Sequence, residues 1–132
     1  MENNRKYGEI EDIPRANGED GEDFPAPPPA LIGGADVMRL LGTLPKTQRE
    51  KLTSGYDIKT LAKIFEDAEA MRTVDAFIEN DLSVCRTARA MYMHRNTLIY
   101  RLNAIRRQTG FDLRVFKMAV TFKILHYLYV LR

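Results

Sequence analysis

From Gly55 to its C-terminus the chain contains no proline and only one further glycine, Gly110. Proline and glycine are the residues that most often interrupt helices and strands, so a stretch this long without them predicts few breaks. Its apolar residues recur at intervals of three and four, as in Ile58, Leu61 and Phe65, which is the period of an amphipathic helix. The pattern predicts an all-α fold.

Polar residues at the expected helix ends set the first boundaries. Asp36 is expected to cap a short helix, and the run from Thr47 to Glu50 has the spacing of a capping box for another short turn. Asp57 is expected to cap a long helix whose apolar period continues to Asn80. A break or kink is expected within that helix, near residues 69–73.

The boundaries of the remaining helices are predicted in the same way. Ser83 is expected to open a helix, and Thr109 with Gly110 to close the one that follows. Asp112 is expected to cap a last long helix over about residues 113–131.

The first part of the chain differs in composition from the rest. Residues 1–30 hold five of the six prolines and few large apolar side chains, too few to offset the entropy of ordering. We therefore expect residues 1–34 to form a disordered, acidic, proline-rich leader and residues 35–132 to form the helical domain. The leader is interpreted as a solvated linker, with a docking ligand for a protein partner as the alternative.

The net charge of +2 hides a strong asymmetry along the chain. Residues 1–36 carry nine acids and three bases, residues 37–81 eight acids and seven bases, and residues 82–132 one acid and ten bases. Such a division predicts a basic surface that binds a polyanion. The acidic leader could fold back on that surface and compete with the polyanion.

Several classes of protein are disfavoured by the composition. No apolar run is long enough for a transmembrane helix, and the polar N-terminus is not a secretory signal. Cys85, the single cysteine, excludes an internal disulfide and favours the cytoplasm; it is expected to be a small core residue. We see no catalytic constellation, metal-ligand spacing or phosphate loop, so neither an enzyme nor a cofactor or metal is expected.

Residues 83–108 have the spacing of two helices joined by a tight turn. Ala88 is small where the helices would cross, and Met91 and Met93 flank Tyr92 at the turn. On the second helix one apolar stripe is expected to be buried, with spacings of four and three: Leu98, Leu102 and Ile105.

The outer face of that second helix carries long basic and amide side chains and no acid. Its members are Arg95, Asn96, Tyr100, Asn103, Arg106 and Arg107. A helix with this face, at about residues 95–107, is expected to enter the major groove of double-stranded DNA with its first turn. Arginine suits guanine, asparagine suits adenine, and Thr97 with the free N–H groups of the first turn can hold a phosphate. Five residues are expected to contact the DNA backbone: Arg86 and Arg89 on the preceding helix, and Asn103, Arg106 and Arg107 further along the second helix.

Three of these residues have alternative interpretations. Arg101 adjoins the buried stripe, so it either has a structural role, bracing the turn or pairing with an acid such as Asp75, or contacts a phosphate. Tyr100 either packs in the core or faces the groove. His94 stands where an N-cap is expected, which favours capping or phosphate contact over metal ligation.

The run from Thr87 to Leu102, and above all His94-Arg95-Asn96-Thr97-Leu98-Ile99-Tyr100-Arg101-Leu102, resembles the C-terminal helix-turn-helix domain of PucR-type (CdaR-like) transcriptional regulators. The Asn-Thr-Leu core is more distantly similar to the Fis-like group. The resemblance covers about residues 57–130 and implies sequence-specific DNA binding and control of transcription. It carries DNA contact over to His94, Arg95, Asn96, Thr97, Tyr100 and Arg101. Family members usually place a long sensory region ahead of this domain, where this sequence has its leader.

The last predicted helix is apolar on more than one face. Such a helix is either central to the core or covers part of a second subunit, and a homodimer would match paired half-sites on DNA. Membrane binding by this basic, aromatic helix is a weaker alternative. A rival to the DNA-binding hypothesis is a protein-protein interaction module with the same fold.

Overall fold

The computed structural model of the chain describes residues 23–132, and within them it contains seven α-helices and no strand. The all-α prediction is therefore confirmed for the described part. Along the chain the helices are α2 (Ala35–Gly42), α3 (Lys46–Thr53), α4 (Ile58–Phe65), α5 (Ala68–Glu79), α6 (Val84–Ala90), α7 (Arg95–Thr109) and α8 (Phe116–Leu131). None of these helices is both long and apolar enough to span a bilayer.

Of the predicted leader, residues 1–22 lie outside the described residues. Residues 23–30 are exposed and form neither helix nor strand. Ile32 is half-buried, and the Gly33 N–H donates a hydrogen bond to the hydroxyl of Tyr127 at 3.1 Å. The chain is thus attached to α8 just before α2 begins, while disorder of the leader stays a prediction.

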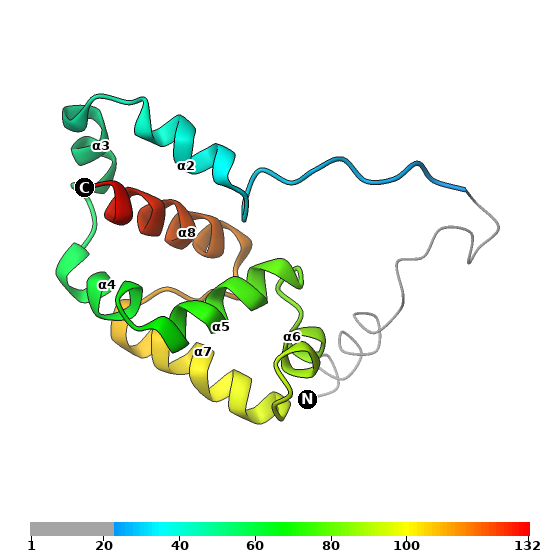
Figure 1. Cartoon of the computed structure of the whole chain (residues 1–132). Coiled ribbons are helices and arrows are strands. Elements are labelled where there is room, and N and C mark those ends of the chain that lie inside the picture. The colour runs from blue at the N-terminus through cyan, green and yellow to red at the C-terminus, as the bar shows by residue number, and fades with distance from the viewer. Residues whose placement is uncertain (1–22) are drawn as a thin grey trace.

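Helix α8 runs through the middle of the molecule, with α2 and α3 on one side and α4 on the other (Figure 1). Its buried residues lie on more than one face: Ala119, Phe122, Lys123, Leu125, Tyr127 and Leu128. Neighbours on two sides explain why the sequence of this helix is apolar over so much of its surface. The expectation that it closes the core is confirmed.

An aromatic cluster connects α8 to the helices around it. The Phe122 ring meets Phe65 of α4 edge-on at a centroid distance of 5.1 Å and Phe111 at 5.5 Å. Phe122 itself is fully buried. Burying a side chain of this size contributes about 2–3 kcal/mol, and edge-to-face contacts add to it.

Three predicted helix boundaries are confirmed. Asp57 caps α4 by accepting a hydrogen bond from the Thr60 N–H at 3.2 Å, and Ser83 caps α6 by accepting one from the Arg86 N–H at 3.1 Å. Gly110 ends α7 with φ 82°, a left-handed conformation that glycine adopts without steric cost.

Three predicted caps are wrong. Helix α2 follows Gly34 with no side-chain cap, and Asp36 lies in its first turn, where it pairs with Arg39. Helix α3 begins at Lys46, directly after Pro45, so the run from Thr47 to Glu50 lies inside the helix instead of capping it. Proline with its fixed φ can precede a helix without any side-chain cap.

The third wrong cap is Asp112. Helix α8 begins at Phe116 with Val115 at its N-cap. The Asp112 carboxylate instead accepts a hydrogen bond from the Arg114 N–H at 3.1 Å and forms an ion pair with Arg106 at 3.4 Å. Asp112 thus closes a turn ahead of the helix.

The break in the predicted long helix lies earlier than residues 69–73. Helix α4 ends at Phe65 and α5 begins at Ala68. Asp67 causes the new start, because its carboxylate accepts hydrogen bonds from the backbone N–H groups of Glu69 and Ala70, both at 3.1 Å. The apolar period continues across this break, so the period alone did not reveal the boundary between α4 and α5.

His126 of α8 is a half-buried titratable group. Its ring centroid lies 5.2 Å from that of Phe65, and its Nδ1 is buried with no hydrogen-bond partner among the described residues. Burial lowers the pKa of this imidazole below its ordinary 6.5, and the charge of Lys123 lowers it further, whereas Asp75 acts in the opposite direction. The folded state therefore resists protonation of His126.

This lowered pKa predicts a loss of stability in mild acid. Because the unfolded chain binds the proton more readily, the contribution is complete above pH 6.5 and is lost as the pH falls towards the pKa of the folded state. Denaturant unfolding at neutral pH and at about one pH unit below 6.5 should show a smaller drop for His126→Gln than for the unaltered chain. An identical drop in both proteins would contradict the assignment.

Candidate nucleic-acid interface

Helices α6 and α7 pack against each other across a tight turn. Ala88 is 4% exposed at their contact, and its carbonyl accepts a hydrogen bond from the Met93 N–H at 2.9 Å. The Tyr92 N–H donates to the Arg89 carbonyl at 3.2 Å, and Tyr92 has φ 54°. These bonds fix the path of the turn and hence the angle between the helices, as the sequence predicts for a helix-turn-helix.

The buried stripe of α7 determines which of its faces points outward. Leu98, Leu102 and Ile105 are 0%, 2% and 4% exposed, so the predicted stripe is confirmed. A second stripe, with spacings of four, three and four, lies on the opposite side of the helix. It consists of Asn96, Tyr100, Asn103 and Arg107, and we call it the outer stripe.

Tyr100 is 67% exposed, so the alternative that it packs in the core is wrong. The Arg107 guanidinium carbon lies 5.8 Å from the centroid of the Tyr100 ring, within the range of a cation–π contact. The middle of the outer stripe therefore presents an aromatic ring and a positive charge side by side.

The first turn of α7 carries side chains with unused hydrogen-bonding capacity. His94 caps the helix as predicted, since its Nδ1 accepts a hydrogen bond from the Asn96 N–H at 3.0 Å. The side chains of Arg95, Asn96 and Thr97 form no hydrogen bond or ion pair with any other residue of the described part. Arg95 is half-buried, whereas Asn96 and Thr97 are exposed. This turn can therefore donate and accept hydrogen bonds outward.

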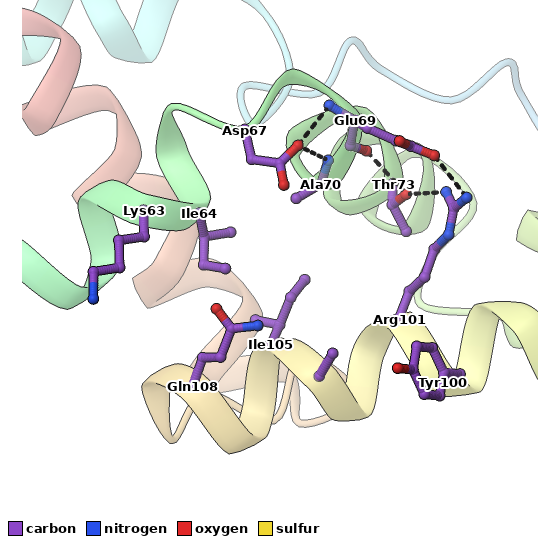
Figure 2. A pocket seen from close by; sticks show the side chains of 11 residues that line it. Lys63, Ile64, Asp67, Glu69, Ala70, Thr73, Tyr100, Arg101, Ile105 and Gln108 are labelled. Atoms are coloured by element: carbon purple, nitrogen blue, oxygen red, sulfur yellow. Dashed lines mark hydrogen bonds and ion pairs between the residues drawn. The ribbon is translucent and has the colours of Figure 1, made fainter.

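Arg101 reaches from α7 to α5 (Figure 2). Its guanidinium donates to the hydroxyl of Thr73 at 3.2 Å and to the Glu69 carboxylate at 2.7 Å. The structure thus supports the bracing role, but Asp75 is not the partner. The Asp75 carboxylate instead binds the Lys123 ammonium of α8 at 2.6 Å.

Some of the predicted backbone contacts also have partners within the protein. The Arg86 guanidinium donates to the Asn80 carbonyl at 3.0 Å and to Asp81 at 2.9 Å, across the connection from α5 to α6. The Asn103 side-chain oxygen accepts a hydrogen bond from Arg114 at 3.0 Å. Of the other predicted contacts, Arg106 pairs with Asp112, and Arg89 and Arg107 are exposed.

A hollow of about 350 Å³ lies between α7 and the helices α4 and α5 (Figure 2). Lys63 and Gln108 stand at one end of it, and Arg101 with Glu69 at the other. Sequence reasoning missed Glu69 and Thr73, because they lie 32 and 28 residues from Arg101. No group of side chains suited to a metal ion occurs among the described residues.

The arrangement defines a helix-turn-helix protein whose second helix turns a basic and amide-rich face outward. Residues 70–125 match the PucR C-terminal helix-turn-helix domain family. The match includes α6, α7 and the turn between them, together with most of α5 and the first part of α8.

Three curated relatives extend the comparison. The chain is 32% identical to the purine catabolism regulatory protein of Bacillus subtilis (strain 168) over 79 residues, which are 60% of this chain and 15% of the relative. It is 31% identical to the uncharacterized protein YxkF of the same strain over 75 residues, 57% of this chain and 25% of the relative. It is 45% identical to the carbohydrate diacid regulator of Escherichia coli (strain K12) over 42 residues, 32% of this chain and 11% of the relative.

The aligned part spans a quarter or less of the length of each of these relatives. No solved structure matches the chain.

The contacts of Arg101 predict a modest loss of stability on its removal. Arg101→Ala should lower the free energy of unfolding by about 1 kcal/mol, because the ion pair with Glu69 is largely exposed and Thr73 keeps a second hydrogen bond. A double-mutant cycle with Glu69→Gln, measured by denaturant unfolding, should give a coupling energy of roughly 0.2–1 kcal/mol. Additive effects of the two substitutions would show that the pair does not hold the helices together.

Proposed function

We propose that this chain is the DNA-reading part of a transcriptional regulator and that α7 enters the major groove of double-stranded DNA. The observation that carries the proposal is the outer stripe, which contains no acid, begins at a capped helix start and has three exposed members, Asn96, Tyr100 and Arg107. An α-helix fits the major groove, and in helix-turn-helix proteins the first residues of the second helix contact base edges. Two of the relatives carry the word regulatory or regulator in their names.

The proposed base contacts come from the first turns of α7. Asn96, exposed and without a partner among the described residues, suits the N6 and N7 edge of adenine. Arg95 suits guanine from the adjoining edge of the helix, and Tyr100 extends the contact one turn further. Thr97 and the positive end of the helix dipole favour a backbone phosphate nearby.

Electrostatics supports DNA as the partner. Asp112 is the single acid in residues 82–132, and its carboxylate is paired with Arg106 and Arg114. Acids from outside the segment pair with three of its cations: Glu69 with Arg101, Asp81 with Arg86 and Asp75 with Lys123. Arg95 and Arg107 have no ion pair within the described residues, so they leave uncompensated positive charge on α7. Binding to a polyanion would release counterions and weaken steeply as salt is added.

Arg101 and Arg86 take a different part in this proposal. Both guanidinium groups are already bonded to carboxylates, Arg101 to Glu69 and Arg86 to Asp81. We assign them chiefly to holding α7 and α6 at the angle that the groove requires. A phosphate contact by either residue stays a prediction, as do the cytoplasmic location and the absence of enzymatic activity.

Substitution of Asn96 tests the groove-reading role. A preferred site would first be selected from random duplexes by the purified chain. Asn96→Ala should then weaken binding to that site by about 1–3 kcal/mol while leaving non-specific binding nearly unchanged, because one base contact is lost.

Lys51→Ala on α3 is the control, since this exposed cation lies outside the residues that match the family. Failure to select any preferred site would overturn the proposal. Salt-insensitive binding to a protein partner, with none to DNA, would establish the interaction-module alternative.

We further propose that the DNA-binding form is a homodimer. Phe116 at the start of α8 is 71% exposed and lines an apolar groove of about 610 Å³ together with Ile78, Leu82 and Val120. Glu79 is among the residues that line this groove, and Lys117 adjoins Phe116 in the sequence. A two-fold contact between copies would bury the apolar groove of one copy against that of the other. It would also bring Glu79 of each copy near Lys117 of the other.

Sedimentation velocity over a range of concentrations tests this dimer. Phe116→Asp should shift the protein towards monomer, because it puts a charge into an apolar contact. Leu40→Asp is the matched control, since Leu40 on α2 is 66% exposed and lies away from the groove lining. A monomer at all concentrations in the unaltered protein, with and without DNA, would contradict the dimer.

A further inference from the structure

Tyr92 is the most exposed large hydrophobic side chain among the described residues, with 97% of its surface accessible. It stands at the tip of the turn between α6 and α7. Its ring and hydroxyl form no stacking contact or hydrogen bond with another residue of the described part. The packing of the folded domain therefore gains almost nothing from this ring.

The backbone of Tyr92 makes the choice of residue more unusual. Its φ of 54° lies in the left-handed region, where a side chain with a Cβ is disfavoured and glycine is not. The hydrogen bonds of Tyr92 to Arg89 and of Met93 to Ala88 hold the backbone there. A strained residue that the fold does not require is a reason to look for a function of its side chain.

The surroundings of Tyr92 indicate what that function is. A hollow of about 510 Å³ lies between the turn and α5, and its lining includes Tyr92, Met93, Arg72 and Arg101. Arg72 is exposed and has no ion pair or hydrogen bond within the described part, whereas Arg101 is bonded to Glu69. Tyr92, which lies four residues ahead of Asn96, and the unpaired Arg72 thus line the same hollow.

We propose that Tyr92 and Arg72 together bind the sugar–phosphate backbone of DNA at the edge of the groove that α7 enters. The hydroxyl of Tyr92 and the guanidinium of Arg72 donate to phosphate oxygens, which are common partners of both side chains in DNA complexes. Their hydrogen bonds carry no sequence information and fix the register of α7 on the duplex. This inference rests on the proposed function, since it extends the same interface to a second element.

The test measures separately how Tyr92 affects the stability of the free protein and how it affects the affinity for DNA. Tyr92→Gly should raise the melting temperature by up to about 5 °C, because glycine relieves the left-handed strain. The same variant should bind both the selected site and random duplex about ten-fold more weakly. Tyr92→Phe, which removes only the hydroxyl, should weaken binding to both DNAs without the rise in melting temperature.

Arg72→Ala supplies an independent measurement. It should reduce the slope of the logarithm of affinity against the logarithm of salt concentration by about 1, as expected for one lost phosphate contact. Lys51→Ala should leave that slope unchanged. The inference is overturned if Tyr92→Gly binds DNA as tightly as the unaltered protein and Arg72→Ala keeps the full slope.

Asn96→Ala distinguishes this failure from a failure of the proposed function. If Asn96→Ala weakens binding to the selected site as predicted while the Tyr92 and Arg72 variants bind normally, only the backbone contact is wrong. If the unaltered protein shows no site preference, both proposals fall.

Discussion

The burial of one stripe of α7 is the constraint on which the rest of the structure depends. Leu98, Leu102 and Ile105 enter the same core cluster as Phe77 of α5 and Phe122 of α8. Each fully buried leucine or isoleucine contributes about 1.5–3 kcal/mol, which is far more than any polar contact on the helix surface. The stripe therefore fixes the rotation of α7 about its axis, and with it the residues that face outward.

Polar contacts refine the position that burial sets. Arg101 ties one flank of α7 to α5, and the Lys123–Asp75 ion pair ties α5 to α8. The Lys123 side chain is 8% exposed, so its charge depends on Asp75 and on the Tyr127 ring, whose centroid lies 4.9 Å from the ammonium. The helices around α7 are thus held by specific pairs as well as by apolar packing.

The sequence predicted the features that local spacing determines. The all-α class, the buried stripe of α7 and the caps at Ser83, His94 and Gly110 follow from residues within one or two turns of each other. The sequence mispredicted helix starts where a polar capping residue and the apolar period indicated different boundaries. Asp67 caps α5 at a point where the apolar period shows no break. Asp112 stabilises a turn that lies three residues before Val115, the N-cap of α8.

Long-range partners were outside the reach of the sequence. The spacing of α7 placed Arg101 beside the buried stripe, but the choice between Glu69 and Asp75 depends on how α5 packs against two other helices. The orientation of Arg72 towards the turn depends on that same packing. Candidates for groove contact could be named from the sequence, whereas their division into outward-facing and bracing residues required the fold.

Methylation interference on a selected DNA site tests the central claim most directly, namely that the outer stripe of α7 reads the major groove. Dimethyl sulfate modifies guanine at N7 in the major groove and adenine at N3 in the minor groove, and these atoms mark which groove a protein occupies. The account predicts that N7-methylated guanines within the site block binding, whereas N3-methylated adenines at its centre have little effect. Interference confined to adenine N3, or absent at every base, would contradict it.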